Sequence, residues 1–229
     1  MNNPLAGVEL PKHIKTHKTS IGIEGMACLL EHAKHTQIEG LVSVICHAGM
    51  RLSEARALTW DDIDFADSSI RINKGLKYVV GEGYITDDAK TSMSRRKIEL
   101  TEDNEVWTML RGLKAQQSVA LLKVGLKVKS TDLIFSTLDG KCWGDTLVQN
   151  GLKNLIKSSG VNMANDWRDL RHLHATVSLL LGEDVKQVSR RLGHASVMIT
   201  YDIYADYISG SDRKASANLT EALAKATAG

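Results

Sequence analysis

The chain has 229 residues, of which 43% are hydrophobic and 24% are charged. This length and composition predict a folded chain with a sizeable core, in one large domain or two small ones, and exclude a disordered or fibrous protein. The formal net charge of +2 excludes a strongly basic, histone-like protein, but a clustered basic surface could still bind DNA. Aromatic residues make up only 5%, which argues against binding of single strands by base stacking.

The cysteines and the apolar segments indicate the compartment. Cys28, Cys46 and Cys142 are far apart and show no Cys/His ligand spacing, so we expect free thiols and no structural zinc. The sequence contains no run of about 18 apolar residues and no signal-peptide segment at its start. These features predict a soluble cytoplasmic protein without a membrane-bound part.

The first 20 residues hold both prolines and a cluster of lysines and histidines, which predicts a linker or arm. Beyond them, apolar residues at helical spacing predict three helices: Ile23–Lys34, Ile38–Ala48 and Glu54–Leu58. We expect Gly49 to end the second helix and Ser53 to cap the third.

After Trp60 the pattern changes to β-branched and alternating residues with glycines at the turns. Three strands are predicted in one small antiparallel sheet: Ser69–Asn73, Tyr78–Val80 and Arg95–Leu100. A polar loop is expected over Asp87–Ser94. The carboxylates of Asp61, Asp62 and Asp64 are expected in a solvated turn before this sheet rather than at a metal site.

The remainder of the chain is predicted to be helical, with Thr101 capping the first helix. The predicted helices are Glu102–Gln117, Gly144–Ser158, Arg168–Leu181, Val185–Leu192, Ser196–Tyr207 and a tail helix Ser211–Ala226. We expect Leu58, Trp60 and Ile63 in the core. The fold class is therefore mostly α with a small antiparallel β-sheet.

Three short motifs lie far apart in the chain, followed by a tyrosine. They are Gly49-Met50-Arg51-Leu52-Ser53-Glu54, Arg168-Asp169-Leu170-Arg171-His172 and Leu192-Gly193-His194, with Tyr204 behind them. From about residue 21 to 207 the chain resembles the catalytic domain of the tyrosine recombinases, the phage integrase family. The family's boxes read G-x-R-x-S-E, H-D-L-R-H and L-G-H before the tyrosine. Each motif is weak alone, but their order and separation are specific.

The resemblance implies a DNA-phosphate site. Arg51 and Arg171 match the two family arginines, whose planar guanidiniums would stabilise charge on the phosphate in the transition state. His194 would donate a hydrogen bond to the phosphate or orient the tyrosine. Glu54 and Asp169 match acidic positions and are expected to orient guanidiniums. No metal and no cofactor are expected.

Tyr204 is the predicted nucleophile. The family places its tyrosine nine or ten residues after the histidine of L-G-H, and Tyr204 follows His194 by ten, whereas Tyr201 follows it by seven. Tyr201 and Tyr207 are expected to have packing roles or none in catalysis. Nearby positive charge or a base would be needed to activate a phenol whose ordinary pKa is about 10.

The second motif departs from the usual family pattern, because Arg168 stands where most relatives have histidine, although some carry other residues there. The family histidine is the usual candidate acceptor for the tyrosine proton, and arginine cannot act as a neutral base. Arg168 could bind a phosphate oxygen, while the proton goes to water or another group, or activity is lowered. His172 and His174 are expected to turn away from the face shared by Arg168 and Arg171, and to have structural roles.

Lys90 lies in a segment similar to the family's K-T-x-x-S-x-R hairpin, whose lysine protonates the leaving oxygen. Lys77 and Lys97 are rival candidates. Between residues 71 and 97 seven Lys/Arg face three Asp/Glu, a basic stripe that could follow a DNA backbone. Within that stripe, contacts to DNA phosphates are expected from Arg95, Arg96 and Lys97.

The resemblance implies a site-specific recombinase that cleaves and rejoins double-stranded DNA through a 3′-phosphotyrosyl link, without ATP, as a homo-tetramer on DNA. A catalytically impaired DNA-binding regulator and a type IB topoisomerase are the alternatives. We expect residues 1–20 to end an upstream core-binding domain, 21–208 to form the catalytic domain, and 209–229 to form a tail that docks on its own core or on a neighbouring protomer. A bacterial or phage origin is expected.

Overall fold

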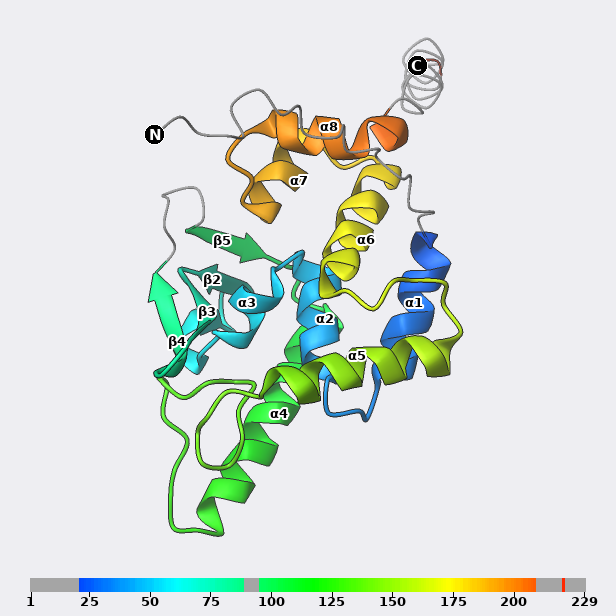
Figure 1. Cartoon of the computed structure of the whole chain (residues 1–229). Coiled ribbons are helices and arrows are strands. Elements are labelled where there is room, and N and C mark those ends of the chain that lie inside the picture. The colour runs from blue at the N-terminus through cyan, green and yellow to red at the C-terminus, as the bar shows by residue number, and fades with distance from the viewer. Residues whose placement is uncertain (1–20, 89–94, 209–219, 221–229) are drawn as a thin grey trace, which may run out of the picture.

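The structure is a computed structural model that describes residues 21–88, 95–208 and 220 (Figure 1). The described helices are α1 (Gly22–Ala33), α2 (Glu39–Ala48), α3 (Leu52–Arg56), α4 (Glu105–Leu122), α5 (Asp145–Ser159), α6 (Trp167–Leu180), α7 (Val185–Leu192) and α8 (Val197–Ile208). A 3₁₀ turn, η1, spans Trp60–Asp62. The expected arm and most of the expected tail helix lie outside the described residues. The mostly α fold class is confirmed.

The strands form two antiparallel sheets instead of the one expected. In the first, the order is β1 (Ile63–Asp64), β2 (Ser69–Ile72) and β5 (Arg96–Glu99), with Ile70 opposite Ile98. The second is a hairpin of β3 (Lys74–Val79) and β4 (Gly83–Asp88).

Strand β4 was not predicted, and its last two residues were expected in a polar loop. Its sequence Gly-Tyr-Ile-Thr-Asp-Asp has three β-forming residues in the middle, but a glycine and two aspartates, which are rare in strands, at its ends. Pairing with β3 from Val79 opposite Gly83 to Lys74 opposite Asp88 holds it extended. Pairing with the partner strand therefore extends this element beyond its three β-forming residues.

Helix α2 is the centre of the core. It packs against α1, α4 and α6 near the middle of the molecule (Figure 1), and most of its side chains are fully buried. The expected core residues Leu58, Trp60 and Ile63 are buried, so that prediction is confirmed. The apolar residues on nearly all sides of α2 account for its position, because a helix that is hydrophobic all round is stable only when enclosed.

Two of the three predicted caps are wrong. Helix α2 does end at Gly49, in the left-handed conformation (φ 63°). Helix α3, however, is capped by Arg51 rather than Ser53, because the Glu54 carboxylate accepts the Arg51 backbone N–H at 2.9 Å. The Asn104 side chain caps α4 by accepting the Val106 N–H, so Thr101 is not the cap.

The aspartates before the sheet are not all solvated, as had been expected. Asp62 is buried, accepts hydrogen bonds from the N–H and hydroxyl of Thr59, and pairs with Lys74 at 2.8 Å. Asp61 and Asp64 are exposed. Asp62 therefore anchors η1 and β3 to each other.

Helices α7 and α8 pack on the C-terminal half of α6, at the end of the molecule opposite the tip of α4 (Figure 1). A small second core joins them. Its buried members are Ala175, Leu179, Val188, Leu192 and Tyr204. No helix in the described part of the chain is long and apolar enough to span a membrane.

Candidate active site

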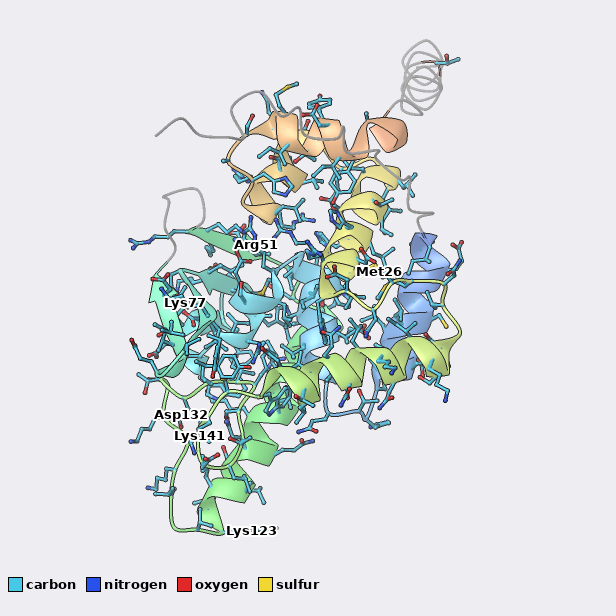
Figure 2. All side chains as sticks on the ribbon, in the orientation of Figure 1. Met26, Arg51, Lys77, Lys123, Asp132 and Lys141 are labelled. Carbon is cyan, nitrogen blue, oxygen red and sulfur yellow. The ribbon has the colours of Figure 1, made fainter. Side chains whose placement is uncertain are left out.

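The predicted arginines Arg51 and Arg171 lie close together, one just after the end of α2 and the other on α6. Arg51 follows the left-handed Gly49 and begins α3, and Figure 2 shows it near the centre of the molecule, beside β5. Arg171 comes from α6 and donates hydrogen bonds to the carbonyls of Gly49 (2.9 Å) and Leu192 (2.6 Å). The Arg171 guanidinium thus ties the end of α2 to the end of α7, while the Arg51 side chain donates to the Gly193 carbonyl at 3.3 Å.

Arg171 is a buried cation beside a second one. Burial and the charge of Arg51 lower the pKa of Arg171 to about 9, against the opposing effect of Glu54. The guanidinium is still protonated at neutral pH. Its two carbonyl partners replace part of the water lost on burial. Arg51 and Arg171 together leave concentrated positive charge that an anion such as a phosphodiester would neutralise.

Glu54 orients the arginines around it. Its Oε1 accepts a hydrogen bond from Arg51 at 2.7 Å, and both of its oxygens accept from Arg96, at 3.0 and 2.8 Å. Burial raises the pKa of Glu54, but hydrogen bonds and charge from Arg96 and Arg51 outweigh this and hold it below its usual value. The carboxylate therefore stays ionised and fixes Arg51, whose side chain remains 41% exposed.

His194 lies beside the arginines, directly after α7. Its Nδ1 is 2.9 Å from the hydroxyl of Thr200, a fully buried residue of α8. Burial and the charges of Arg171 and Arg51 lower the pKa of His194 to about 4. At neutral pH His194 is therefore an uncharged imidazole that can donate a hydrogen bond through one ring nitrogen.

Tyr204 differs from Tyr201 in both burial and backbone. Its side chain is 3% exposed and belongs to the second core, whereas that of Tyr201 is 43% exposed. At Tyr204 the α8 backbone leaves helical geometry (φ −120°, ψ 17°), so the ring is turned inward at a kink. The side chain of Tyr207 lies outside the described residues.

The chain matches the phage integrase family over residues 24–208, which is most of its length. The chain belongs to the phage integrase family. Among curated relatives, the ICEBs1 integrase of Bacillus subtilis is 28% identical over 156 residues, 68% of this chain and 41% of the relative. A XerC-like tyrosine recombinase of Caldanaerobacter subterraneus is 25% identical over 90% of this chain and 56% of its own length. The chain thus spans about half the length of the curated relatives it matches.

Solved structures share the fold of this phage integrase family chain. The Tn1549 transposon integrase in complex with circular intermediate DNA superposes with a TM-score of 0.62 at 21% identity, covering 79% of this chain and 59% of that one. The XerA recombinase gives a TM-score of 0.61 at 22% identity, covering 85% and 61%. The expected catalytic-domain fold is confirmed.

Arg168 lies apart from Arg51 and Arg171 in this family member. Its side chain is 83% exposed, and its guanidinium pairs with Asp166 at 2.6 and 2.8 Å. Asp169, expected to orient guanidiniums, is buried in the first turn of α6. The structure therefore does not gather Arg168 with Arg51 and Arg171, although both α6 arginines were expected on one face.

His172 was expected from the sequence to have only a structural role, but it contacts the predicted nucleophile. Its Nδ1 is 2.7 Å from the Tyr204 hydroxyl, and the two rings lie 5.9 Å apart between centroids. The expectation that His172 turns away from Arg168 is wrong, because residues four apart share a helix face. That spacing was the available signal. His174, by contrast, is buried and hydrogen-bonded to the Cys46 carbonyl, which fits its expected structural role.

The expected DNA contacts separate into two groups. Arg95 and Lys97 are exposed, and Lys97 pairs with Asp67 and with Glu99. Arg96 is 5% exposed, bonded to Glu54 and to the Arg191 carbonyl. Its burial does not fit the expected surface phosphate contact, because the guanidinium is needed to balance Glu54.

Lys90, the expected acid, lies outside the described residues. Of its rivals, Lys77 is on the outer hairpin, away from Arg51 in Figure 2, and pairs with Asp87 at 2.8 Å. Within residues 21–88 and 95–208 no group of three His, Cys, Asp or Glu side chains is placed to hold a metal ion.

Proposed function

We propose that this chain is the catalytic part of a site-specific DNA recombinase or integrase. The observation that carries the proposal is the convergence of Arg51, Arg171 and His194, with Arg171 near enough to Tyr204 to interact electrostatically, from four separate segments. Two cations and a neutral hydrogen-bond donor suit a phosphodiester, and a phenol suits nucleophilic attack on it. The named relatives and the family membership support the same activity.

In the proposed reaction the Tyr204 oxygen attacks a DNA phosphorus atom. A tyrosyl O–P bond forms, the P–O5′ bond breaks, and the 5′-oxygen leaves with a proton from Lys90. Arg51 and Arg171 stabilise the charge on the non-bridging oxygens, and His194 donates a hydrogen bond to one of them. A 5′-hydroxyl of a second strand then reverses the step, so the energy of the broken bond is retained without ATP.

Assembly and location are part of the proposal. Exchange of two strands between two duplexes requires four such sites, so we expect a homo-tetramer on double-stranded DNA. The tail beyond residue 208 would contact its own core or a neighbouring protomer. Arg95 and Lys97 would contact phosphates along the basic stripe. We expect the protein to act in the cytoplasm of a bacterium, where bacterial and phage DNA are located.

The test is covalent capture. Short nicked duplexes tiled across both ends of the DNA element that carries the gene are incubated with the protein and run on a denaturing gel. We expect a protein–DNA adduct that Tyr204→Phe abolishes and Tyr201→Phe retains. Binding in a band-shift assay without any adduct would contradict the proposal and favour a DNA-binding regulator. Relaxation of supercoiled plasmid without site preference would favour a topoisomerase.

A further inference from the structure

The residue at position 168 is unable to accept the proton that Tyr204 must lose. Its guanidinium is exposed, pairs with Asp166, and is held in the charged form by that pair, which raises the pKa of Arg168. A guanidinium has no acceptor site in any case. If Tyr204 is the nucleophile, its proton needs another destination near the phenol.

His172 lies where that destination is needed. It follows Arg168 by four residues on α6, so its imidazole projects from the same helix face about one turn farther along. Its Nδ1 is 2.7 Å from the Tyr204 oxygen, within the range of a strong hydrogen bond. The phenol is 3% exposed, so bulk water has little access to it as a competing acceptor.

Resting on the proposed function, we infer that His172 is the general base for Tyr204, in place of the histidine that relatives carry one helical turn earlier. As the tyrosyl O–P bond forms, the phenol proton passes to His172 Nδ1, giving an imidazolium. When the incoming 5′-hydroxyl breaks that bond, His172 returns the proton to the phenol oxygen. His172 contacts a reacting atom and is thus a catalytic residue in this reaction.

The groups around the pair favour transfer in this direction. Arg171 precedes His172 on α6, and His194 lies close enough to His172 for the two to interact electrostatically. Arg171 and Arg51 are cations that stabilise the phenolate, which makes removal of the phenol proton less costly. Burial and the charges of the two arginines keep His194 uncharged, and its Nδ1 is 2.9 Å from the Thr200 hydroxyl, so that nitrogen already has a partner on α8. The Tyr204 hydroxyl faces His172 from α8.

The first experiment is single-turnover adduct formation at pH 5.5 to 9 with wild type and His172→Gln. Glutamine keeps a hydrogen-bonding group near the phenol but accepts no proton. We expect the wild-type rate to fall on acidification, as the His172 imidazole becomes charged and can no longer accept the proton. His172→Gln should be about 100-fold slower at pH 7, with a rate that still rises toward pH 9.

A second substrate separates the base from the acid. Sulfur in place of the bridging 5′-oxygen leaves as a thiolate and needs no proton, so it restores variants that lack the acid. His172→Gln should stay slow on this substrate, because its defect lies in the nucleophile. The matched control is His32→Gln, the same change at an exposed histidine of α1, which should keep the wild-type rate and profile.

The contact itself is tested without activity, by nuclear magnetic resonance titration of His172 in the free protein. Tyr204→Phe should change the His172 ring shifts and midpoint, and an unchanged titration would overturn the inference. A wild-type protein that binds DNA without forming an adduct would overturn the proposed function and this inference together. An adduct formed by His172→Gln at the wild-type rate, or slowly but with the wild-type pH profile, would overturn this inference alone.

Discussion

Arg96 and Glu54 form a buried, two-bonded ion pair, with both guanidinium nitrogens on the carboxylate at 3.0 and 2.8 Å and the side chains 5% and 8% exposed. The pair joins β5 to α3, 42 residues apart, and also holds Arg51 through the same carboxylate. The Arg96 Nε donates to the Arg191 carbonyl of α7. Through Arg96 and Arg51, the Glu54 carboxylate thus connects the sheet, the start of α3 and α7.

Replacing this carboxylate should be costly. Glu54→Gln leaves Arg96 buried without its counter-charge, so we expect the free energy of unfolding to fall by about 3 kcal/mol at pH 7 in urea denaturation. The pKa of Glu54 is lowered on folding, so its stabilisation is present above the unfolded value and is lost as the pH falls through the folded one. The difference between wild type and variant should therefore shrink below about pH 4.

Glu99→Gln is the matched control, because Glu99 pairs with Lys97 on the surface and is 71% exposed. Screening by water makes such a pair nearly neutral, so stability should be unchanged within error. Equal stability of the two variants would show that the buried pair does not hold the three elements together.

Gly49 should tolerate no side chain. Its φ is 63°, and a Cβ would lie 2.5 Å from His174 Cδ2 and 3.0 Å from a Leu192 methyl carbon. Gly160 has the same role at the end of α5, with φ 67° and nothing within 4 Å. Gly160→Ala should lower the free energy of unfolding by about 1 kcal/mol, because alanine is strained in the left-handed conformation. Gly49→Ala should lower it by about 1 to 3 kcal/mol more, because its Cβ also overpacks the core.

The adduct assay gives this pair of variants a second readout. Gly49 also supplies the carbonyl that accepts from Arg171, so a shift at Gly49 should move that guanidinium and slow adduct formation. Gly160→Ala should form the adduct at the wild-type rate. Equal losses of stability in the two variants, measured by urea denaturation, would contradict the packing argument.

Much of the fold could be predicted because its signals are local. Helix α7 has its predicted bounds, Val185–Leu192, since an aspartate cap and a glycine stop flank it directly. Strand β4 was missed although Tyr84, Ile85 and Thr86 favour a strand, and its full length depends on pairing with β3. The choice of Arg51 over Ser53 as cap depends on Glu54, which is fixed by Arg96 from β5.

For the candidate site, the residues could be predicted from local motifs but their contacts could not. Short motifs that resemble the boxes of the family were enough to select the candidate residues Arg51, Arg171, His194 and Tyr204. The partners of these residues are distant in sequence: 32 residues separate His172 from Tyr204, and 122 separate Arg171 from Gly49. Such contacts arise from how α6, α7 and α8 pack, which no local pattern contains. The burial of Arg96 was missed for that reason.

Arg171 should not be replaceable by lysine. The planar fork donates to two carbonyls from two different nitrogens, and one ammonium cannot reproduce that geometry. Arg171→Lys should lower the free energy of unfolding by about 1 to 3 kcal/mol and slow adduct formation by about 100-fold. The control for stability is Arg168→Lys on the same helix, an exposed arginine whose replacement should leave the unfolding midpoint unchanged. Wild-type stability and rate in Arg171→Lys would show that charge alone suffices at this position.

His174 should make the protein acid-sensitive. Burial lowers its pKa to about 4, partly offset by the hydrogen bond to the Cys46 carbonyl. Because that carbonyl accepts, Nδ1 carries the proton and the buried Nε2, which has no hydrogen-bond partner among the described residues, is the unprotonated nitrogen. The unfolded chain takes up a proton below about pH 6.5 and the folded chain does not. Stability is therefore lost as the pH falls from about 6.5 toward 4.

Urea denaturation at pH 7 and pH 4.5 measures this loss. His174 should account for a loss of about 2 kcal/mol in the free energy of unfolding between pH 7 and pH 4.5. The pKa of His194 is also lowered to about 4, so His194 adds to this loss over the same pH range. His174→Gln should be less stable at pH 7, because it breaks the Cys46 bond and disturbs packing, but should lose less on acidification. His32→Gln, an exposed histidine, should keep the wild-type loss. An undiminished loss in His174→Gln would mean that the acid sensitivity comes from other groups, since a residue without a titrating ring cannot carry the linkage.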